Sequence, residues 1–439
     1  MSFTRLWEAL LPIGRDERTG GYRRYSFSEA ELACRAWFRA AAAERGLPVT
    51  TDRNTNLYAW WHPPTSSIKT PPATSSTQTS SASENTVASS APRLGPWDGA
   101  IVTGSHLDSV PDGGAFDGPL GVASGFAAID LLRARGCVPV RPIAVGAFCE
   151  EEGARFGLAC LGSRLLTGVV TPARALALRD GDGVSLAEAM TAAGYDPALV
   201  GPDDELLASI GAFVELHVEQ GRALAEPLLG ANAAIGIAEG IWPHGRWRFD
   251  FAGRADHAGT ARLADRHDPM LPFAATVIAA RRCADSLGTL ATFGKVRAEP
   301  GGVNGISSSV RAWLDARAPD QAGLDRTVGD ITAAAGQAAR EHGVELSVTN
   351  ESVTPPVGFD LALRDRVAGV LAAAGIDAPV LPTGAGHDAG VLAARVPTAM
   401  LFVRNPTGIS HAPGEHADLA DCEAGVTALA AVLEDLACR

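Results

Sequence analysis

The chain has 439 residues, enough for two or three domains with a substantial hydrophobic core. Hydrophobic residues make up 46% and charged residues 20% of the sequence, as in ordinary globular proteins. The net charge of −13 comes without a basic stripe that could neutralise phosphates, which argues against nucleic-acid binding. No run of about 18 apolar residues predicts a membrane span.

The cysteine pattern bears on the cellular compartment. The seven cysteines are odd in number, scattered and without CxxC spacing, which favours reduced thiols over a disulfide framework. Residues 1–18 lack the charged and apolar regions of a signal peptide. We therefore expect a cytoplasmic protein.

The N-terminal part predicts a helix, a strand and then a long loop. Ser28 is suited to cap a helix over residues 28–45, and residues 56–61 have the pattern of a strand. Residues 62–97 are rich in Ser, Thr and Pro, and they carry too few apolar residues to offset the entropy cost of ordering. We expect this segment to be a disordered insertion.

The stretch from Gly104 to Gly118 carries the first residues suited to chemistry. A short apolar strand at 100–103 leads into it, and an Ala/Leu-rich helix is expected over residues 119–135. His106 would lie at the carboxyl end of the strand and Asp117 just before the helix. Open α/β sheets bind ligands at that edge. An imidazole and a carboxylate placed together there form half of a divalent metal site.

Two further predicted strands end in residues of the same kind. Residues 142–148 are followed by Cys149 and then by Glu150, Glu151 and Glu152, and residues 212–216 end at His217. Taken singly, the glutamates fit a solvated surface run and His217 fits a half-exposed strand histidine. Three such strand ends together indicate a shared rim.

The pattern changes near residue 235. The expected elements are then, in order, strand 247–252, helix 270–287, strand 289–297, strand 308–315, helix 324–342 and strand 344–348. This βαββαβ order is that of a ferredoxin-like α+β unit. The α/β pattern returns with helix 360–374, strands 379–382 and 398–403, and a C-terminal helix. We expect an α/β domain, residues 1–237 and 354–439, split by an insertion at 238–353.

The residues at the strand ends suggest a site for two cations. The candidate ligands are His106, Asp117, Glu151 or Glu152, His217 and His411. Two cations about 3.5–4 Å apart need a bridging carboxylate, and Asp117 can offer both its oxygens. A second, uncoordinated carboxylate would serve as general base. Gly153 would supply the turn that lets neighbouring glutamates reach one site. The remaining histidines considered are expected to be structural or exposed, namely His244, His267, His342 and His416.

Six sequence blocks occur in order along nearly the whole chain. They are GSHLDSV through FDG at 104–118, EEGARF at 151–156, ELHVEQG at 215–221, GRADHAGT at 253–260, GAGHDA at 384–389 and GISH at 408–411. In this order they resemble the amidase branch of the M20 di-metal hydrolases, which includes N-carbamoyl-L-amino acid hydrolases, β-ureidopropionases and allantoate amidohydrolases. The histidine at 217, where peptidase relatives tend to carry Asp, favours the amidase branch.

The resemblance implies an α/β, di-metal peptidase-like catalytic domain split by a ferredoxin-like lid and dimerisation domain. It implies two divalent ions per subunit, drawn from Zn, Mn, Co or Ni. His106 and His217 would hold one ion, Glu152 and His411 the other, and Asp117 would bridge them. Glu151 would be the general base.

The resemblance also implies a homodimer and a set of substrate contacts. These contacts are Gln220, His257, Asn304, Arg317, Gly386 and His387. The guanidinium of Arg317 would bind a substrate carboxylate as a bidentate fork, although a surface salt bridge is the structural alternative. His257 would approach a neighbouring subunit's site, where it would stabilise the developing oxyanion.

The expected reaction is cleavage of the ureido (N-carbamoyl) C–N bond of a small carboxylate, with release of ammonia and carbon dioxide. Allantoate and N-carbamoyl-L-amino acids both fit, and the loop at 403–411 resembles allantoate-type members slightly more. One alternative is a peptidase or deacylase of the same superfamily. Another is a non-catalytic binding protein, which predicts the loss of a ligand, whereas all five ligand positions are filled.

Overall fold

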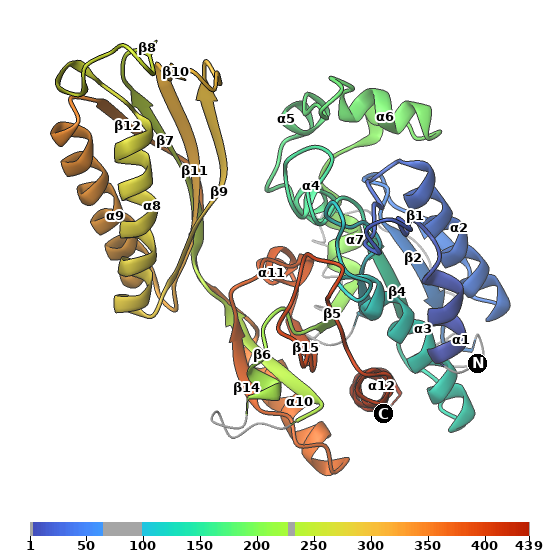
Figure 1. Ribbon diagram of the computed structural model, residues 1–439. Helices are drawn as coiled ribbons and strands as arrows, with labels where there is room; N and C mark the ends of the chain where they lie inside the picture. The colour runs from blue at the N-terminus through green and yellow to red at the C-terminus, as the bar shows by residue number, and fades with distance from the viewer. Residues whose placement is uncertain (1–2, 65–98, 227–232, 439) are drawn as a thin grey trace, which may run out of the picture. The chain divides into compact units, whose positions relative to one another are not determined.

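The computed structural model describes residues 3–64, 99–226 and 233–438 (Figure 1). These residues form two compact units. The first unit consists of the described residues up to Glu239, residues Phe359–Leu381, and those from Gly386 onward. The second consists of Gly240–Gly358 with Pro382–Ala385. Most of the predicted insertion 62–97 lies outside the described residues.

The first unit is built on a mixed sheet. Its strands are β1 (Val49–Thr51), β2 (Leu57–Trp61), β3 (Ala100–His106), β4 (Ile143–Phe148), β5 (Ile210–Val218), β6 (Ile235–Ile241) and β15 (Thr398–Val403). They follow the order β1-β2-β4-β3-β5-β15-β6, and β14 (Val380–Thr383) also pairs with β6. The four central strands are mutually parallel, and every residue in them is buried. Their unbroken apolar character follows from burial on both faces.

Helices cover this sheet. They are α1 (Phe3–Leu10), α2 (Glu29–Glu44), α3 (Pro119–Ala134), α4 (Leu161–Leu166), α5 (Pro172–Leu176), α6 (Leu186–Ala192), α7 (Asp204–Ser209), α10 (Leu361–Ala373), α11 (Asp388–Leu392) and α12 (Leu419–Ala437). The predicted N-cap is confirmed, because the Ser28 hydroxyl accepts a hydrogen bond from the Glu31 N–H at the start of α2.

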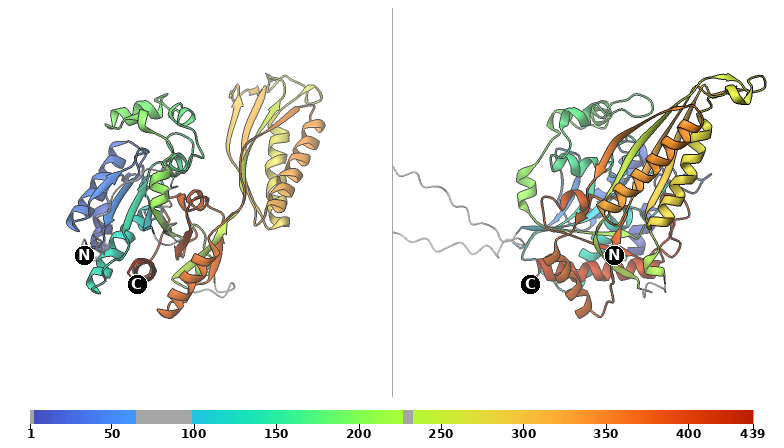
Figure 2. Two further views of the ribbon diagram at one scale, coloured as in Figure 1. Left: turned by 180° about the vertical axis from the view of Figure 1, so that it is seen from behind. Right: turned by 90° about the vertical axis from the view of Figure 1, so that its left-hand side faces the viewer.

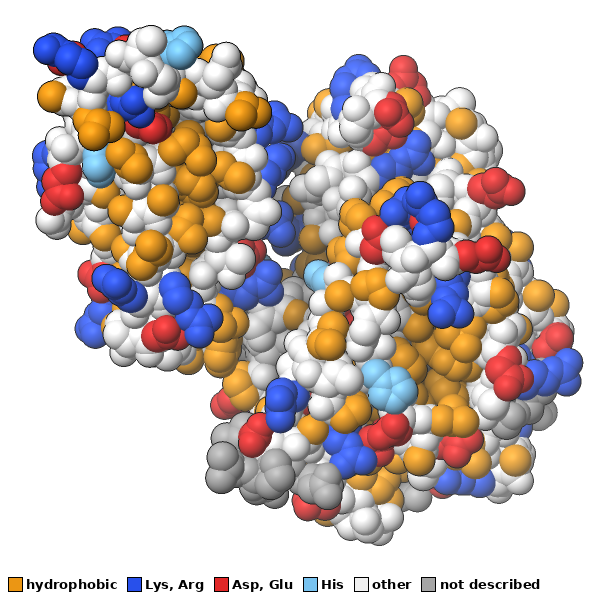
Figure 3. All heavy atoms as spheres, viewed as in Figure 1, with side chains coloured by type: hydrophobic (Ala, Val, Ile, Leu, Met, Phe, Trp, Pro, Cys, Tyr) orange, Lys and Arg blue, Asp and Glu red, His pale blue; other side chains and the backbone are white. Residues whose placement is uncertain are grey.

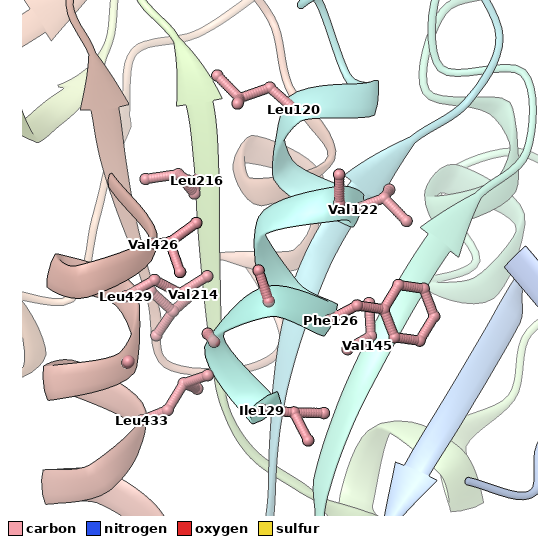
Figure 4. Close-up of a cluster of buried hydrophobic side chains, with 14 of the residues drawn as sticks. Leu120, Val122, Phe126, Ile129, Val145, Val214, Leu216, Val426, Leu429 and Leu433 are labelled. Atoms are coloured by element: carbon pink, nitrogen blue, oxygen red, sulfur yellow. The ribbon is translucent and has the colours of Figure 1, made fainter. Parts of the chain in front are cut away.

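The main core lies between α3, α12 and the central strands (Figure 4). Phe126 and Ile129 of α3 are fully buried, as are Val214 of β5 and Leu429 of α12. Helix α3 is apolar nearly all round, as expected of a helix enclosed by its own domain. This packing fixes the α3 N-terminus at the carboxyl edge of β3.

The second unit is a four-stranded antiparallel sheet with two helices. Its elements are β7 (His244–Ala252), β8 (Asp256–His257), α8 (Met270–Leu287), β9 (Leu290–Glu299), β10 (Gly305–Ile306), β11 (Ser309–Arg317), α9 (Gln321–Glu341), β12 (Glu345–Thr354) and β13 (Val357–Gly358). The sheet order is β12-β7-β11-β9, and β8 pairs with β10. Helices α8 and α9 lie side by side on one face of the sheet (Figures 1 and 2). The chain follows the βαββαβ order predicted for residues 247–348.

Several elements differ from the sequence prediction. Strand β5 continues through His217 to Val218, so this histidine lies within a strand and does not follow it. Helix α9 begins three residues earlier than predicted, where the Asp320 carboxylate caps the Gly323 N–H. Strand β6 was not predicted, because Gly236 and Gly240 interrupt its apolar pattern. Within the described ranges, no helix is both long and apolar enough to cross a membrane.

Candidate metal centre

The candidate ligands gather at one edge of the first unit's sheet. His106 is the last residue of β3, and Glu151 and Glu152 follow the end of β4. His217 lies near the end of β5, and His411 follows β15. Because these four strands are parallel, their carboxyl ends lie on the same side, as predicted.

One group of donor atoms surrounds the first oxygen of Asp117. Nε2 of His106 lies 3.4 Å from Asp117 Oδ1, and Nε2 of His217 lies 3.2 Å from the same oxygen. Three donor atoms from these residues lie within 4.8 Å of one another. Both Nε2 atoms are buried and have no hydrogen-bond partner among the described residues. Such a group has the composition and compactness of a cation site.

A second group surrounds the other oxygen of the same carboxylate. Nε2 of His411 lies 3.4 Å from Asp117 Oδ2 and 3.4 Å from Glu152 Oε2. His411 adopts a left-handed backbone conformation with φ of 56°, and its side chain is 51% exposed. Asp117 therefore offers a different oxygen to each group, which is the arrangement of a bridging carboxylate.

Hydrogen bonds orient the two buried imidazoles. His106 Nδ1 lies 3.1 Å from the carbonyl oxygen of Asp108, and His217 Nδ1 lies 2.8 Å from that of Val218. A carbonyl oxygen can only accept, so each Nδ1 carries the proton. Each Nε2 faces Asp117, and once it has lost its proton its lone pair is available to a cation.

The turn after β4 directs two adjacent glutamates to different places. Glu150 has a φ of 54° and Gly153 a φ of 64°. The Asp108 carboxylate accepts hydrogen bonds from the N–H groups of Glu151 at 3.2 Å and Glu152 at 3.1 Å. The turn thus depends on Glu150 as well as on the predicted Gly153. It brings Glu151 Oε2 to 3.6 Å from His106 Nε2, while Glu152 Oε2 faces His411.

Two neighbours restrict the positions of Glu151 and Asp117. The Cys160 thiol lies 3.2 Å from Glu151 Oε1 and donates a hydrogen bond to it. Gly118 has a φ of 84°, and a Cβ added there would lie 2.4 Å from the His106 ring. Only glycine combines that backbone conformation with that close approach.

The electrostatics of the site favour bound cations. Burial and the neighbouring Asp117 charge raise the pKa of Glu152 to about 8, and burial raises the pKa of Glu151 well above its usual range. Burial opposes charge on Asp117, yet the imidazoles of His106, His217 and His411 around it hold its pKa well below its usual value. The hydrogen bond with Asp117 raises the pKa of His411 to about 9. Carboxylates crowded this way retain protons unless cations replace them.

Three of the predicted substrate contacts lie in the first unit. The Gln220 side-chain amide donates to Asp117 Oδ2 at 2.6 Å, and its nitrogen lies 3.3 Å from His411 Nε2. His387 is buried, with its ring 4.5 Å from that of His217. Burial, aided by the charge of His217, holds the pKa of His387 well below its usual value, so its ring is neutral. Gly386 immediately precedes it.

The other three predicted contacts lie in the second unit. His257 of β8 is paired with Gly305 of β10, and the Ala258 N–H donates to the carbonyl oxygen of Asn304, so His257 and Asn304 are close together. Arg317 is the final residue of β11, two residues beyond the predicted strand end. Its guanidinium donates to both carboxylate oxygens of Asp315, at 2.8 and 3.3 Å, and to the carbonyl oxygen of Gly384 at 2.6 Å. The salt bridge considered as the structural alternative is therefore present.

The sequence reasoning missed several residues that shape the site. They are Asp108, which holds the glutamate turn, the partly buried Ser410, and the buried Glu415, Glu215 and Asp388. Asp108 carried a usable signal, since it lies two residues after His106. The oxygens of Glu215 accept from the Ser105 hydroxyl and the Ala389 N–H, so that carboxylate is an orienting group within the wall of the site.

The chain is similar in sequence and fold to known amidohydrolases. The chain is 34% identical over 428 residues to the N-carbamoyl-L-amino acid amidohydrolase of Geobacillus stearothermophilus, covering 97% of this chain and 96% of that protein. It is 32% identical over 342 residues to the allantoate amidohydrolase of Bacillus subtilis (strain 168), covering 77% and 82%. The fold is similar to the crystal structure of AtUAH in complex with (S)-hydroxyglycine, with a TM-score of 0.81, 26% identity and coverage of 99% and 96%.

A second solved structure has a similar fold. An amidase of the hydantoinase/carbamoylase family from Burkholderia vietnamiensis has a TM-score of 0.81 and 28% identity, with coverage of 100% of this chain and 98% of that one. Residues 102–435 match the profile of peptidase family M20/M25/M40. These findings confirm the resemblance predicted from the six sequence blocks. The chain belongs to the M20 family and is similar to that family's amidohydrolases.

Proposed function

We propose that this protein hydrolyses the ureido C–N bond of a small carboxylate such as an N-carbamoyl-L-amino acid or allantoate. The similarity to N-carbamoyl-L-amino acid and allantoate amidohydrolases supports a hydrolase of C–N bonds other than peptide bonds. The observation that carries the proposal is the pair of donor groups sharing Asp117, with the Glu151 carboxylate beside them.

The donor sets suit divalent cations. In our proposal, His106 and His217 would hold one ion, Glu152 and His411 would hold a second, and Asp117 would contribute an oxygen to each group. Imidazole and carboxylate ligands accept Zn, Mn, Co or Ni. When bound, such cations act as Lewis acids and lower the pKa of water.

Glu151 is the proposed general base. Its side chain is not needed to complete either donor group, and it lies 3.6 Å from a ligand nitrogen of His106. Its carboxylate takes a proton from the attacking water, and water oxygen adds to the ureido carbonyl carbon. Glu151 then returns the proton to the leaving nitrogen as the C–N bond breaks. The amine is released with carbamic acid, which decomposes to ammonia and carbon dioxide.

We propose roles for the six predicted substrate contacts. Gln220, which already contacts Asp117 Oδ2, and neutral His387 beside His217 would contact the ureido end, with Gly386 next to them. Arg317 would contact the substrate carboxylate through the donors that remain, since Asp315 and Gly384 fix the orientation of its guanidinium. His257 of a neighbouring subunit, close to its own Asn304, would stabilise the oxyanion.

A homodimer through the second unit is part of the proposal. Leu271 and Ile278 of α8 are 50% and 54% exposed, and Figure 3 shows hydrophobic side chains gathered on this unit. Strand β9 lies at the end of the sheet order, with an unpaired edge among the described strands. Ile278→Arg should yield a monomer by light scattering, whereas Leu199→Arg, at an exposed leucine of the first unit, should not. A monomeric unaltered chain would refute the dimer.

The reaction is tested by ammonia release from a substrate panel with metal-reconstituted protein. The panel holds allantoate, several N-carbamoyl-L-amino acids, N-acetyl amino acids and dipeptides. We expect ammonia from at least one ureido acid and faster turnover of it than of any dipeptide or N-acetyl compound. Preferred cleavage of a dipeptide or acetyl compound would instead indicate the peptidase or deacylase.

A further inference from the structure

Glu415 connects two ligand-bearing segments that are far apart in the sequence. It lies four residues after His411, and its own N–H donates to the carbonyl oxygen of Ala412. Its Oε2 accepts hydrogen bonds from the backbone N–H groups of Phe116 at 2.8 Å and Asp117 at 3.0 Å. One carboxylate oxygen thus links the backbone of the bridging ligand to the segment that carries His411.

The surroundings of Glu415 are shaped to this contact. The residue is only 5% exposed. A Cβ added to Gly114 would lie 2.2 Å from Glu415 Oε2 and 2.4 Å from its Cβ, so a larger residue at 114 would displace the carboxylate. The chain therefore passes the Glu415 carboxylate at a point where only glycine leaves enough room.

The cost of burying this carboxylate indicates a role beyond simple packing. Its Oε1 is buried and has no hydrogen-bond partner among the described residues. It also lies beside Asp117, whose negative charge repels it. Burying a carboxyl group with one unsatisfied oxygen is unfavourable, which indicates that the position of Glu415 contributes to the site.

The hydrogen bonds of Glu415 act on one donor group more directly than on the other. Asp117 and His411 belong to the group completed by Glu152, and Glu415 joins the Asp117 backbone to the segment that carries His411. The first group is completed by His106 and His217, whose imidazoles are held by carbonyl oxygens of their own segments. Loss of Glu415 would leave those two imidazoles oriented.

We propose that Glu415 is a positioning residue that holds Asp117 in register with His411 and thereby sets the affinity of the Asp117–Glu152–His411 group for its cation. This inference rests on the proposed di-metal function. Groups that orient metal ligands typically change metal affinity by about 10- to 100-fold when removed.

The test compares Mn²⁺ binding by calorimetry in full-length variants. Glu415→Ala should weaken the second of two Mn²⁺ binding steps about 10- to 100-fold and the first less than about threefold. Glu415→Gln keeps a carbonyl oxygen for the two N–H groups and should restore the second step to within about threefold of the unaltered chain. Glu423→Ala, at an exposed glutamate of α12, is the matched control and should change neither step.

A background lacking His411 separates positioning from general destabilisation. In His411→Ala, Glu415→Ala should change the remaining Mn²⁺ step less than about threefold, because the affected group is already incomplete. If Glu415→Ala does not fold, Gly114→Ala replaces it and should weaken the second step selectively. Equal weakening of both steps, or no weakening, would overturn the inference. Absence of any Mn²⁺ binding by the unaltered chain would instead overturn the proposed function.

Discussion

His217 Nε2 lies 3.2 Å from Asp117 Oδ1, although the two residues come from different elements of the first unit. His411 approaches the other oxygen of the same carboxylate at 3.4 Å. One side chain therefore belongs to both donor groups. The consequences of altering it should differ from those of altering any other ligand.

Asp117→Asn should remove more bound metal than His411→Ala. The first change weakens both donor groups, because each uses one Asp117 oxygen, while the second change affects one group only. We expect fewer than one tightly bound ion per chain in Asp117→Asn and about one in His411→Ala. Metal analysis after gel filtration gives these numbers. Equal loss in the two variants would argue against a bridging Asp117.

Glu151→Gln should abolish turnover while leaving metal bound. The amide cannot accept the proton of the attacking water, and neither donor group needs Glu151. We expect kcat to fall about 10²- to 10⁴-fold with unchanged metal content. Glu205→Gln, at an exposed position in α7, serves as the control. Retained activity in Glu151→Gln would reject this residue as the base.

In the metal-free protein, the effect of Glu152→Gln on the free energy of unfolding should depend on pH. The pKa of Glu152 is raised by burial and by Asp117 to about 8 in the folded chain, above the ordinary value of 4.5. A raised folded-state pKa contributes stability that is present below pH 4.5 and is lost as pH rises through about 8.

Glutamine does not titrate. The free energy of unfolding of Glu152→Gln should therefore rise relative to that of the unaltered chain as the pH increases from about 5 to about 8. Urea unfolding in the presence of a chelator measures the difference. If the difference in free energy of unfolding between the two proteins stays constant, or if the variant becomes relatively less stable as the pH rises, the raised pKa of Glu152 is contradicted.

Arg317→Ala should raise KM for ureido substrates that carry a carboxylate. Loss of a charge-assisted contact to the substrate carboxylate corresponds to an increase in KM of about 10- to 100-fold. Arg311→Ala removes an arginine from the same strand, and its ion pair with Asp250 does not involve Arg317. We expect that control to leave KM unchanged. If Arg317→Ala has the same KM as the unaltered chain, Arg317 serves only as a structural partner of Asp315.

The sequence was sufficient to predict which side chains meet at the sheet edge. His106 and His217 lie at the ends of apolar runs, and parallel strands place such ends together. The exact end of β5 was harder to predict, because His217 and Val218 continue the ladder to β15 even though the histidine is polar.

The interactions that hold the candidate ligands in place could not be predicted from the local sequence pattern. The turn after β4 depends on a positive φ at Glu150, a residue type that gives no such signal. The partners of Glu415 are backbone N–H groups up to 299 positions away, which no periodicity reveals. Tertiary packing determines both features.

We propose that a pair of cations around Asp117 drives ureido hydrolysis. The most direct measurement titrates the chelator-treated protein with Mn²⁺ while recording ammonia release from its best ureido substrate and counting bound ions. We predict negligible release without metal and full release only as the second ion binds, with none in Asp117→Asn. Full ammonia release by the metal-free chain, or no release with two ions bound, would contradict a reaction driven by the cation pair.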